Sequence, residues 1–214
     1  MKPLLIWDFD GTIVDNASLL LACMNTALAE LGSTHVLTRQ DLCVCSLEQL
    51  IKKSSLSVFR IPSFIRRVTA LVEQETLSIR PHPHIQELLS FCAQHATQVI
   101  VSSNKQEIIL RYLALHSLES FFSSVSSAGF FTKSLAIRRQ RRDFGLSKHS
   151  CLYIGDESRD IHAAHQAGID ILSVSWGLQG AAALLDARPR FLASTVSEAK
   201  ELLSVWFTYA QSMR

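Results

Sequence analysis

The sequence contains few residues of the kinds that mark special classes of protein. Only five of its 214 residues are proline and eight are glycine, so little of the chain can be disordered or of low complexity. Its five cysteines are odd in number and scattered, with no Cys-x-x-Cys pair, which argues against a disulfide framework and a zinc site. We therefore expect reduced thiols. The length suffices for one large domain, or for one domain that carries an insertion.

Long apolar runs and a strong charge of one sign are also missing. No segment approaches about 18 uncharged apolar residues, and the apolar stretch after Lys2 ends at Asp8, too soon for the core of a signal peptide. The net charge of +2 does not call for nucleic acid or an acidic membrane as a partner. The one strong basic cluster, residues 138–142, favours a solvated helix face. We expect a cytoplasmic monomer or homodimer that binds neither nucleic acid nor membrane.

What the chain does contain is a regular alternation of strand and helix patterns. Buried or β-rich runs predict strands near residues 4–7, 98–102, 123–127, 151–155 and 169–174. Apolar residues at helical spacing predict helices near residues 84–95, 106–115, 134–144 and 160–167. This alternation predicts an α/β fold with a doubly wound parallel sheet.

Helical segments without a convincing strand interrupt this alternation early in the chain. Apolar spacing predicts helices near residues 19–31, 38–53 and 62–77. The first can be capped by Asn16 or Ser18, and a Thr-Arg-Gln-Asp cap opens the second. The domains expected from this pattern are a core of residues 1–15 and 81–214 and a helical cap of residues 16–80.

Two aspartates at the end of the first strand are the most informative feature. Asp8 and Asp10 stand two residues apart in an extended segment, so both carboxylates point to one side, and Gly11 lets the chain turn away. Two negative charges held close together are unfavourable unless a cation or a shared proton relieves them. We therefore expect a positive group at this strand end, where ligands of open parallel sheets bind.

The later strands also end in polar residues. Ser102, Ser103 and Asn104 follow the second strand, where hydroxyls and free backbone N–H groups are suited to phosphate oxygens. Lys133 follows the third strand, where its ammonium can neutralise a carboxylate and a phosphate oxygen. Asp156 and Asp160 form a second acidic pair, one helical turn apart, after the fourth strand. Two acidic pairs in one sheet are hard to explain by structure alone.

Four aspartates at neighbouring strand ends suit Mg²⁺, which prefers carboxylates, water and phosphate oxygens to soft ligands. With one Mg²⁺ and the Lys133 ammonium, they carry a formal charge of −1, so one carboxylate can hold a proton. One member of the first pair can then attack phosphorus to give an aspartyl-phosphate, while its neighbour protonates the leaving oxygen and later activates water.

These residues resemble the four motifs of the haloacid dehalogenase-like superfamily. The resemblance is carried by Asp8-Phe9-Asp10-Gly11-Thr12, the Ser102 strand end, Lys133, and Gly155-Asp156 followed by Asp160. Ala167-Gly168-Ile169 and Val174-Ser175-Trp176-Gly177 are similar to the phosphoglycolate-phosphatase-like branch, whose small helical cap is inserted after the first motif. The resemblance covers nearly the whole chain and implies a core of that family's fold with an all-helical cap.

The resemblance also implies a role for each motif residue. Asp8 is expected to be the nucleophile, Asp10 the general acid and base, and Lys133 the third catalytic residue. Mg²⁺ would be held by Asp8, the backbone carbonyl of Asp10 and Asp156, with Asp160 ligating the ion or orienting its water. The residues expected to bind the phosphate group are Gly11, Thr12, Ser102, Ser103 and Asn104.

Two assignments keep an alternative. The family commonly has proline after the motif lysine, and this chain has Ser134, so Lys105 remains a rival to Lys133. Ser102 is favoured over Ser103 for the hydroxyl contact because it directly ends the strand, with Ser103 donating its backbone N–H.

The expected function is a Mg²⁺-dependent phosphatase that hydrolyses a small phosphorylated metabolite, a phosphoglycolate-like monoester, through an aspartyl-phosphate. The alternatives are a phosphosugar mutase or an inorganic pyrophosphatase on the same scaffold, a phosphoacceptor signalling domain, and a non-catalytic protein that binds a phosphorylated ligand. The cap is expected to close over the strand ends and to contribute at least one basic contact to the remote end of the substrate. The candidates for that contact are Lys52, Lys53, Arg60, Arg66 and Arg67.

Overall fold

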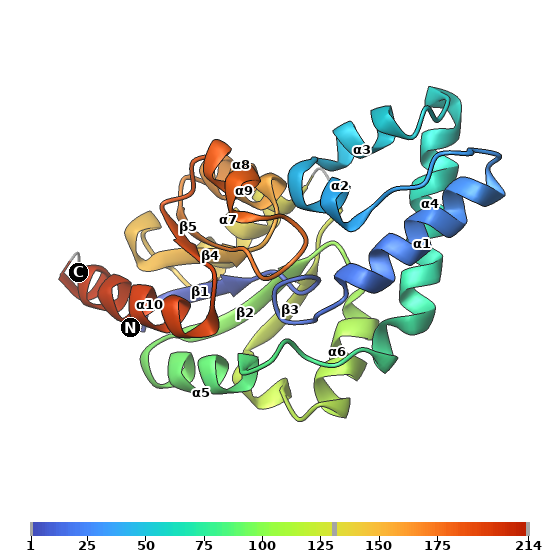
Figure 1. The fold of residues 1–214 in the computed structure, drawn as a ribbon. Coiled ribbons are helices and arrows are strands. Elements are labelled where there is room, and N and C mark those ends of the chain that lie inside the picture. The colour runs from blue at the N-terminus through green and yellow to red at the C-terminus, as the bar shows by residue number, and fades with distance from the viewer. Residues whose placement is uncertain (1, 130–131, 213–214) are drawn as a thin grey trace.

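The centre of the structure is a parallel six-stranded sheet with the order β3-β2-β1-β4-β5-β6 (Figure 1). The structure is a computed structural model and describes residues 2–129 and 132–212. The strands are β1 (Leu4–Trp7), β2 (Thr97–Ser102), β3 (Ser124–Ser127), β4 (Cys151–Gly155), β5 (Asp170–Val174) and β6 (Phe191–Ala193). Strand β1 pairs with β2 on one side and with β4 on the other, so the strand order reverses at β1. Ligands of open parallel sheets bind at such a point, beyond the carboxyl ends of the strands.

Helices cover both faces of the sheet. One face carries α5 (Ile85–His95), α6 (Gln106–Leu115) and α10 (Val196–Ser212), and the other carries α7 (Lys133–Asp143), α8 (Ser158–Ala167) and α9 (Ala181–Asp186). All four residues of β1 are fully buried, as expected for a central strand that is covered on both sides. The predicted doubly wound α/β fold is confirmed.

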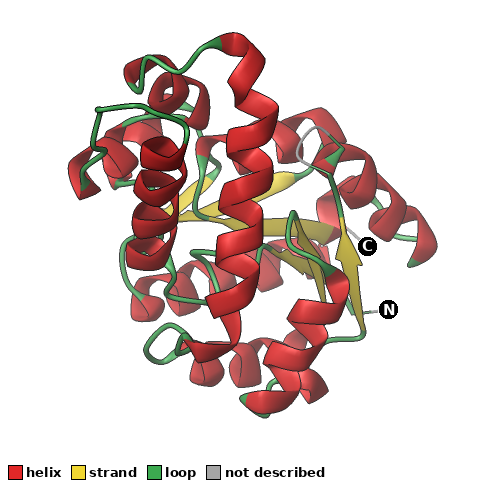
Figure 2. Cartoon of the chain, turned by 90° about the vertical axis from the view of Figure 1, so that its right-hand side faces the viewer, coloured by secondary structure: helices red, strands yellow, loops and turns green. Residues whose placement is uncertain are grey.

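Four helices between β1 and α5 pack around an apolar cluster of their own, and they lie beside the carboxyl ends of the strands (Figure 2). They are α1 (Ala17–Glu30), α2 (Arg39–Val44), α3 (Leu47–Lys53) and α4 (Ile61–Glu75). Met24, Leu28 and Phe64 are among the buried residues of this cluster. The short 3-10 helices of the chain are Val58–Arg60, Thr76–Ser78, Glu119–Phe121 and Lys148–Ser150. The division into two domains at residues 16 and 80 stays a prediction.

Two parts of the helical pattern differ from expectation. The helix predicted over residues 38–53 is divided, because Cys45 and Ser46 are extended and Ser46 starts a new capping box with Gln49. The sequence pattern did not predict β6, α9 or α10. Strand β6 has only three residues and is defined by its pairing with β5, a contact that local sequence does not encode.

The start of α2 gives a stability prediction. Thr38 Oγ1 accepts a hydrogen bond from the Asp41 N–H, and Asp41 Oδ2 accepts one from the Thr38 N–H. Thr38→Ala removes the first contact, so we expect a loss of about 1 kcal/mol in the free energy of unfolding. Urea unfolding checks this, with Thr34→Ala on the exposed loop before α2 as the matched control. Equal unfolding midpoints for the two variants would contradict the capping role.

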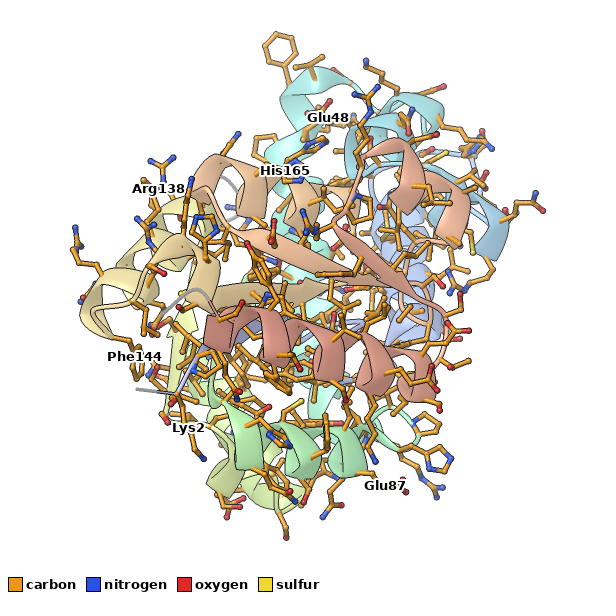
Figure 3. The ribbon with its side chains drawn as sticks, turned by 90° about the vertical axis from the view of Figure 1, so that its left-hand side faces the viewer. Lys2, Glu48, Glu87, Arg138, Phe144 and His165 are labelled. Atoms are coloured by element: carbon orange, nitrogen blue, oxygen red, sulfur yellow. The ribbon has the colours of Figure 1, made fainter. Side chains whose placement is uncertain are left out.

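The basic cluster of residues 138–142 lies on α7, on the outside of the molecule. Arg138 points to the edge of the protein, where it donates to the carbonyl of Gln166 (Figure 3). Arg139 pairs at 3.5 Å with Asp143 on the same helix. This arrangement is that of a solvated helix face.

Candidate active site

Lys133 joins two of the predicted aspartates. Its side chain is 4% exposed, and its Nζ lies 2.8 Å from Asp8 Oδ2 and 2.6 Å from Asp160 Oδ1. Burial disfavours the ammonium, but the carboxylates of Asp160 and Asp8 outweigh this and raise the pKa of Lys133. The rival Lys105 is exposed and pairs instead with Glu73 of α4, at 2.8 Å. The structure therefore brings Lys133, and not Lys105, to the aspartates.

Asp156 is fixed by contacts from two loops. Thr12 Oγ1 donates to its Oδ1 at 3.0 Å, and the Leu178 N–H donates to its Oδ2 at 2.7 Å. Glycine is required on both sides: a Cβ on Gly11, where φ is +73°, would lie 2.1 Å from Asp156 Oδ2, and one on Gly177 would lie 2.3 Å from the same atom. The two loops can thus close around this carboxylate only because they lack side chains there.

Asp8, Asp156 and Asp160 form a compact, buried cluster of carboxylates. One oxygen from each lies within 4.8 Å of the others. Burial raises the pKa of Asp8 to about 7, although the Lys133 ammonium lowers it. Burial also raises the pKa of Asp156 well above its usual range, and the carboxylates of Glu157, Asp160 and Asp8 add to the effect. Three acidic oxygens with one ammonium among them fit a divalent cation, which would relieve this unfavourable charge.

Asp10 lies apart from this cluster and lines a cavity. Asn16 Nδ2 donates to Asp10 Oδ1 at 2.6 Å, and Asn104 Nδ2 lies 3.3 Å from its Oδ2. Burial raises the pKa of Asp10, and the Asn104 hydrogen bond lowers it. Asn16, one of the two residues expected to cap α1, stands at the N-cap position but makes no capping bond with its side chain, and its Nδ2 binds Asp10 instead. Asn104 likewise contacts Asp10, so it orients the carboxylate.

The two serines at the end of β2, Ser102 within the strand and Ser103 directly after it, face opposite sides of the sheet. Val99 and Val101 pack on the same face as Leu4 and Ile6, and Ile100 packs on the other. By this alternation Ser103 shares the face of Asp8, whereas Ser102 does not. The Ser102 hydroxyl is buried and accepts from the Asn104 N–H at 3.1 Å.

Ser103 lines the cavity, and its Oγ lies 3.4 Å from Arg159 Nη1. The geometry therefore favours the Ser103 hydroxyl over the Ser102 hydroxyl as a contact for a ligand in the cavity, although Ser102 is the residue that ends the strand.

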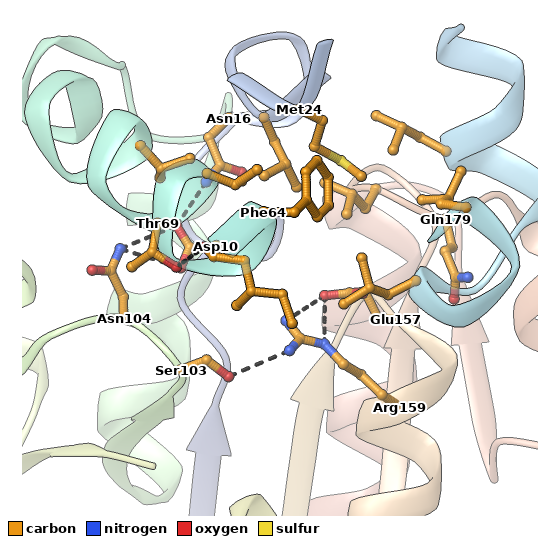
Figure 4. A pocket seen from close by; sticks show the side chains of 18 of the residues that line it. Asp10, Asn16, Met24, Phe64, Thr69, Ser103, Asn104, Glu157, Arg159 and Gln179 are labelled. Carbon is orange, nitrogen blue, oxygen red and sulfur yellow. Dashed lines mark hydrogen bonds and ion pairs between the residues drawn. The ribbon is translucent and has the colours of Figure 1, made fainter. Parts of the chain in front are cut away.

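Sequence reasoning also overlooked Arg159. Its guanidinium is held by Glu157, whose Oε1 lies 2.8 Å from Nε and 2.6 Å from Nη2 (Figure 4). Burial disfavours its charge, but Glu157, Asp160 and Asp8 outweigh this and raise the pKa of Arg159. A signal was available, since Arg159 is the one cation inside the acidic segment from Asp156 to Asp160.

A cavity of about 180 Å³ lies between the sheet and helices α1 to α4. Asp10, Ser103, Asn104 and Arg159 line it on the side of the sheet. Helices α1 to α4 and the loop after α2 line it mainly with apolar side chains: Leu20, Met24, Leu42, Cys45, Leu47, Leu50, Phe64, Ile65, Val68 and Val72.

The basic residues expected to face the substrate do not line this cavity in the described part of the chain. Lys53 pairs with Asp41, Arg67 pairs with Glu30 at 2.6 Å, and Arg60 donates to the carbonyl of Leu31. Lys52 and Arg66 are exposed. Four of the five thus lie at the solvated surface of α3, α4 and the 3-10 helix between them, and the fifth, Arg67, is half-buried in its ion pair.

The loop after β5 connects the helical group to the site. Arg39 donates from Nη1 to the Leu178 carbonyl and from Nη2 to the Gly177 carbonyl, both at 2.7 Å. Gln179 Nε2 donates to the Cys45 carbonyl at 2.9 Å. The loop that holds Asp156 therefore also holds the apolar wall of the cavity in place.

A family profile described as haloacid dehalogenase-like hydrolase matches residues 5–174. The chain belongs to the haloacid dehalogenase-like hydrolases. It is 27% identical over 198 residues to a phosphoglycolate phosphatase from Synechococcus elongatus, covering 91% of this chain and 93% of the relative. It is 23% identical over 206 residues to a pyrophosphatase, PpaX, from Listeria monocytogenes, with the same coverage. A haloacid dehalogenase-like family hydrolase from Streptococcus pneumoniae has the same fold, with a TM-score of 0.78 at 21% identity, covering 96% of this chain and 98% of that one.

The expectation of an enzyme of this hydrolase family, similar to its phosphoglycolate phosphatases, is confirmed. The two relatives are named for different substrates, so similarity does not choose between them. Among the described residues of this haloacid dehalogenase-like hydrolase, no helix has both the length and the apolar character needed to cross a membrane.

Proposed function

We propose that this hydrolase is a Mg²⁺-dependent phosphatase that cleaves a small phosphorylated metabolite through an aspartyl-phosphate on Asp8. The observation that carries the proposal is the position of Lys133 Nζ, within 2.8 Å of Asp8 and 2.6 Å of Asp160, beside the third buried carboxylate of Asp156. One ammonium and one divalent cation would balance three carboxylates and leave a neutral site for an incoming phosphate.

The side chains that we assign to Mg²⁺ are Asp8, Asp156 and Asp160, together with the backbone carbonyl of Asp10. All are oxygen donors, which suits a hard cation. When bound, Mg²⁺ would supply positive charge to the transferring phosphoryl group. Lys133 would hold Asp8 and Asp160 in place and add its own charge at the same point.

In the proposed reaction, Asp8 forms the bond to phosphorus and Asp10 transfers the protons. An oxygen of Asp8 attacks phosphorus, and the bond from phosphorus to the leaving oxygen breaks. Asp10, held on the cavity side by Asn16 and Asn104, gives its proton to that leaving oxygen. Asp10 then takes a proton from water as the water attacks phosphorus, which releases phosphate and restores Asp8.

Two of the groups expected to bind phosphate already donate hydrogen bonds within the protein. The Gly11 N–H already donates to the Val14 carbonyl at 3.0 Å, and the Thr12 hydroxyl donates to Asp156. We therefore assign phosphate binding to the Thr12 N–H, the Ser103 hydroxyl and the guanidinium of Arg159, which reaches toward Ser103.

The two serines provide a matched test of this assignment. Ser103→Ala removes a hydroxyl that we place on the phosphate, so we expect kcat/KM to fall about 10- to 100-fold. Ser102→Ala removes a hydroxyl on the opposite face, so kcat/KM should stay within about threefold. Steady-state kinetics on one phosphate monoester checks both variants. The reverse order of effects would return the role to Ser102.

The proposed function itself is tested with a panel of phosphorylated compounds. The panel contains phosphoglycolate, sugar phosphates, nucleotides, pyrophosphate and an activated aryl phosphate, each with Mg²⁺ and with a chelator. We expect Mg²⁺-dependent release of inorganic phosphate from monoesters. Isomerisation of a sugar phosphate without phosphate release would identify a mutase, and turnover of pyrophosphate alone would identify a pyrophosphatase. Binding without turnover of any compound would identify a non-catalytic protein.

A further inference from the structure

The cavity next to Asp10 has two chemically different ends (Figure 4). Its sheet end carries Asp10, Ser103 and Arg159, where we place the phosphoryl group. Its far wall is formed by the helical group, with α1 and α4 contributing Met24 and Phe64, and Figure 4 shows these two on the side opposite Arg159. Met24 and Phe64 are each 2% exposed, so their positions are set by the packing of the helices themselves. This wall is a preformed surface for the part of the substrate that leaves.

The far wall offers no positive charge. Among the described residues that line the cavity, Arg159 is the single cation, and Glu157 and Ser103 hold it at the sheet end. Lys105 is 64% exposed and directs its ammonium to Glu73. A second anionic group on the substrate would therefore lose its water among apolar side chains without gaining a partner, which is strongly unfavourable.

Glu73 makes an anionic group still less favourable at this wall. It lines the cavity from α4, and its Oε2 binds Lys105 at 2.8 Å. Its Oε1 is buried and has no hydrogen-bond partner among the residues that the structure describes. A carboxylate on the substrate would meet this oxygen as a like charge, whereas a hydroxyl on the substrate would donate to it.

We propose that the leaving group of the natural substrate is an uncharged, mainly apolar alcohol that sits between α1 and α4. The inference rests on the proposed phosphatase function and names its substrate class. Attack by Asp8 breaks the bond between phosphorus and the oxygen of this alcohol, which departs neutral with the proton from Asp10. The alcohol is of moderate size at most, since the cavity of about 180 Å³ also takes the phosphoryl group at its sheet end, and an apolar cavity of about 150 Å³ accommodates a benzene-sized group.

A series of n-alkyl monophosphates, from ethyl to octyl, tests the proposal on the unmodified protein with Mg²⁺. The leaving oxygens have nearly the same chemistry, so differences in kcat/KM report on the fit of the chain. We expect kcat/KM to rise about fourfold for each added methylene until the cavity is full. Hexyl phosphate should then exceed phosphoglycolate by at least about tenfold. An activated aryl phosphate serves as the measure of basal activity.

A matched pair of charge variants on α4 tests the wall directly. Val68→Lys places an ammonium at the cavity, and Gln74→Lys places the same charge on the exposed side of the helix. Val68→Lys should lower the ratio of kcat/KM for hexyl phosphate to that for phosphoglycolate at least about tenfold. Gln74→Lys should leave this ratio within about twofold.

The outcomes separate the inference from the function on which it rests. Hydrolysis of the aryl phosphate with no gain along the alkyl series, or with phosphoglycolate preferred, would overturn the apolar leaving group and leave the phosphatase intact. No Mg²⁺-dependent hydrolysis of any ester would overturn both. If Val68→Lys does not fold, the n-alkyl phosphate series on the unmodified protein still tests the apolar leaving group.

Discussion

Asp8→Asn is expected to lower kcat by at least about 10⁴-fold, because an amide does not attack phosphorus and does not balance a divalent cation. The variant keeps the shape of the side chain. Since burial raises the pKa of Asp8 to about 7, the folded protein disfavours the charge, and its removal should not lower the thermal midpoint. Steady-state kinetics with the aryl phosphate and thermal unfolding give the two readouts.

The control for this experiment is Asp15→Asn, which changes an exposed carboxylate in the same segment and should retain activity. A crystal soaked with beryllium fluoride adds a structural readout, since the phosphoryl mimic should lie on the Asp8 carboxylate. Full activity in Asp8→Asn, or the mimic on another residue, would remove Asp8 as the nucleophile.

Asp10→Asn is expected to lower kcat/KM by an amount that depends on the leaving group of the substrate. For an alkyl phosphate, whose leaving oxygen needs a proton, kcat/KM should fall about 10²- to 10⁴-fold. For an activated aryl phosphate the loss should be much smaller, because that oxygen departs without a proton. The amide can still accept from Asn16 through its oxygen, so the position of the side chain is kept.

Asp156→Ala provides the contrast to Asp10→Asn. Asp156 belongs to the carboxylate cluster, so its loss should raise the Mg²⁺ concentration needed for half-maximal activity on every substrate. Measuring rate against Mg²⁺ for both variants with both leaving groups separates the two roles. If the two variants show the same dependence on leaving group and the same Mg²⁺ requirement, the assignments of Asp10 and Asp156 are wrong.

Local patterns identified the residues that meet at the strand ends. Asp8, Lys133, Asp156 and Asp160 follow segments whose strand or helix character could be identified from hydrophobic spacing. Parallel strands bring their carboxyl ends to one edge of the sheet, so predicting the strands also predicts the neighbours. The sequence also indicates which of Ser102 and Ser103 shares the face of Asp8, because side chains alternate between the two faces along a strand. Alternation places Ser103 on the face of Asp8, whereas the position of the strand end favoured Ser102.

Other features depended on contacts between distant segments. Strand β6 exists through its pairing with β5, and Lys105 is turned away from the site by Glu73, which lies 32 residues earlier in the chain. Gly177 is required because Asp156 approaches it closely, which no pattern around Gly177 reveals. Such features need the relative placement of whole elements.

The sequence alone determined the fold class, the family resemblance, and the aspartates and Lys133 at the strand ends, because these follow from local periodicity and from short motifs. Only the tertiary structure decided which side chains the helices α1 to α4 present to the cavity. Spacing shows which residues share a helix face, but the face turned to the site depends on how α1, α3 and α4 pack together. That packing leaves the basic side chains in surface ion pairs and exposed positions and turns Met24, Phe64 and Val68 inward, since burying apolar area is favourable and burying an unpaired charge is not.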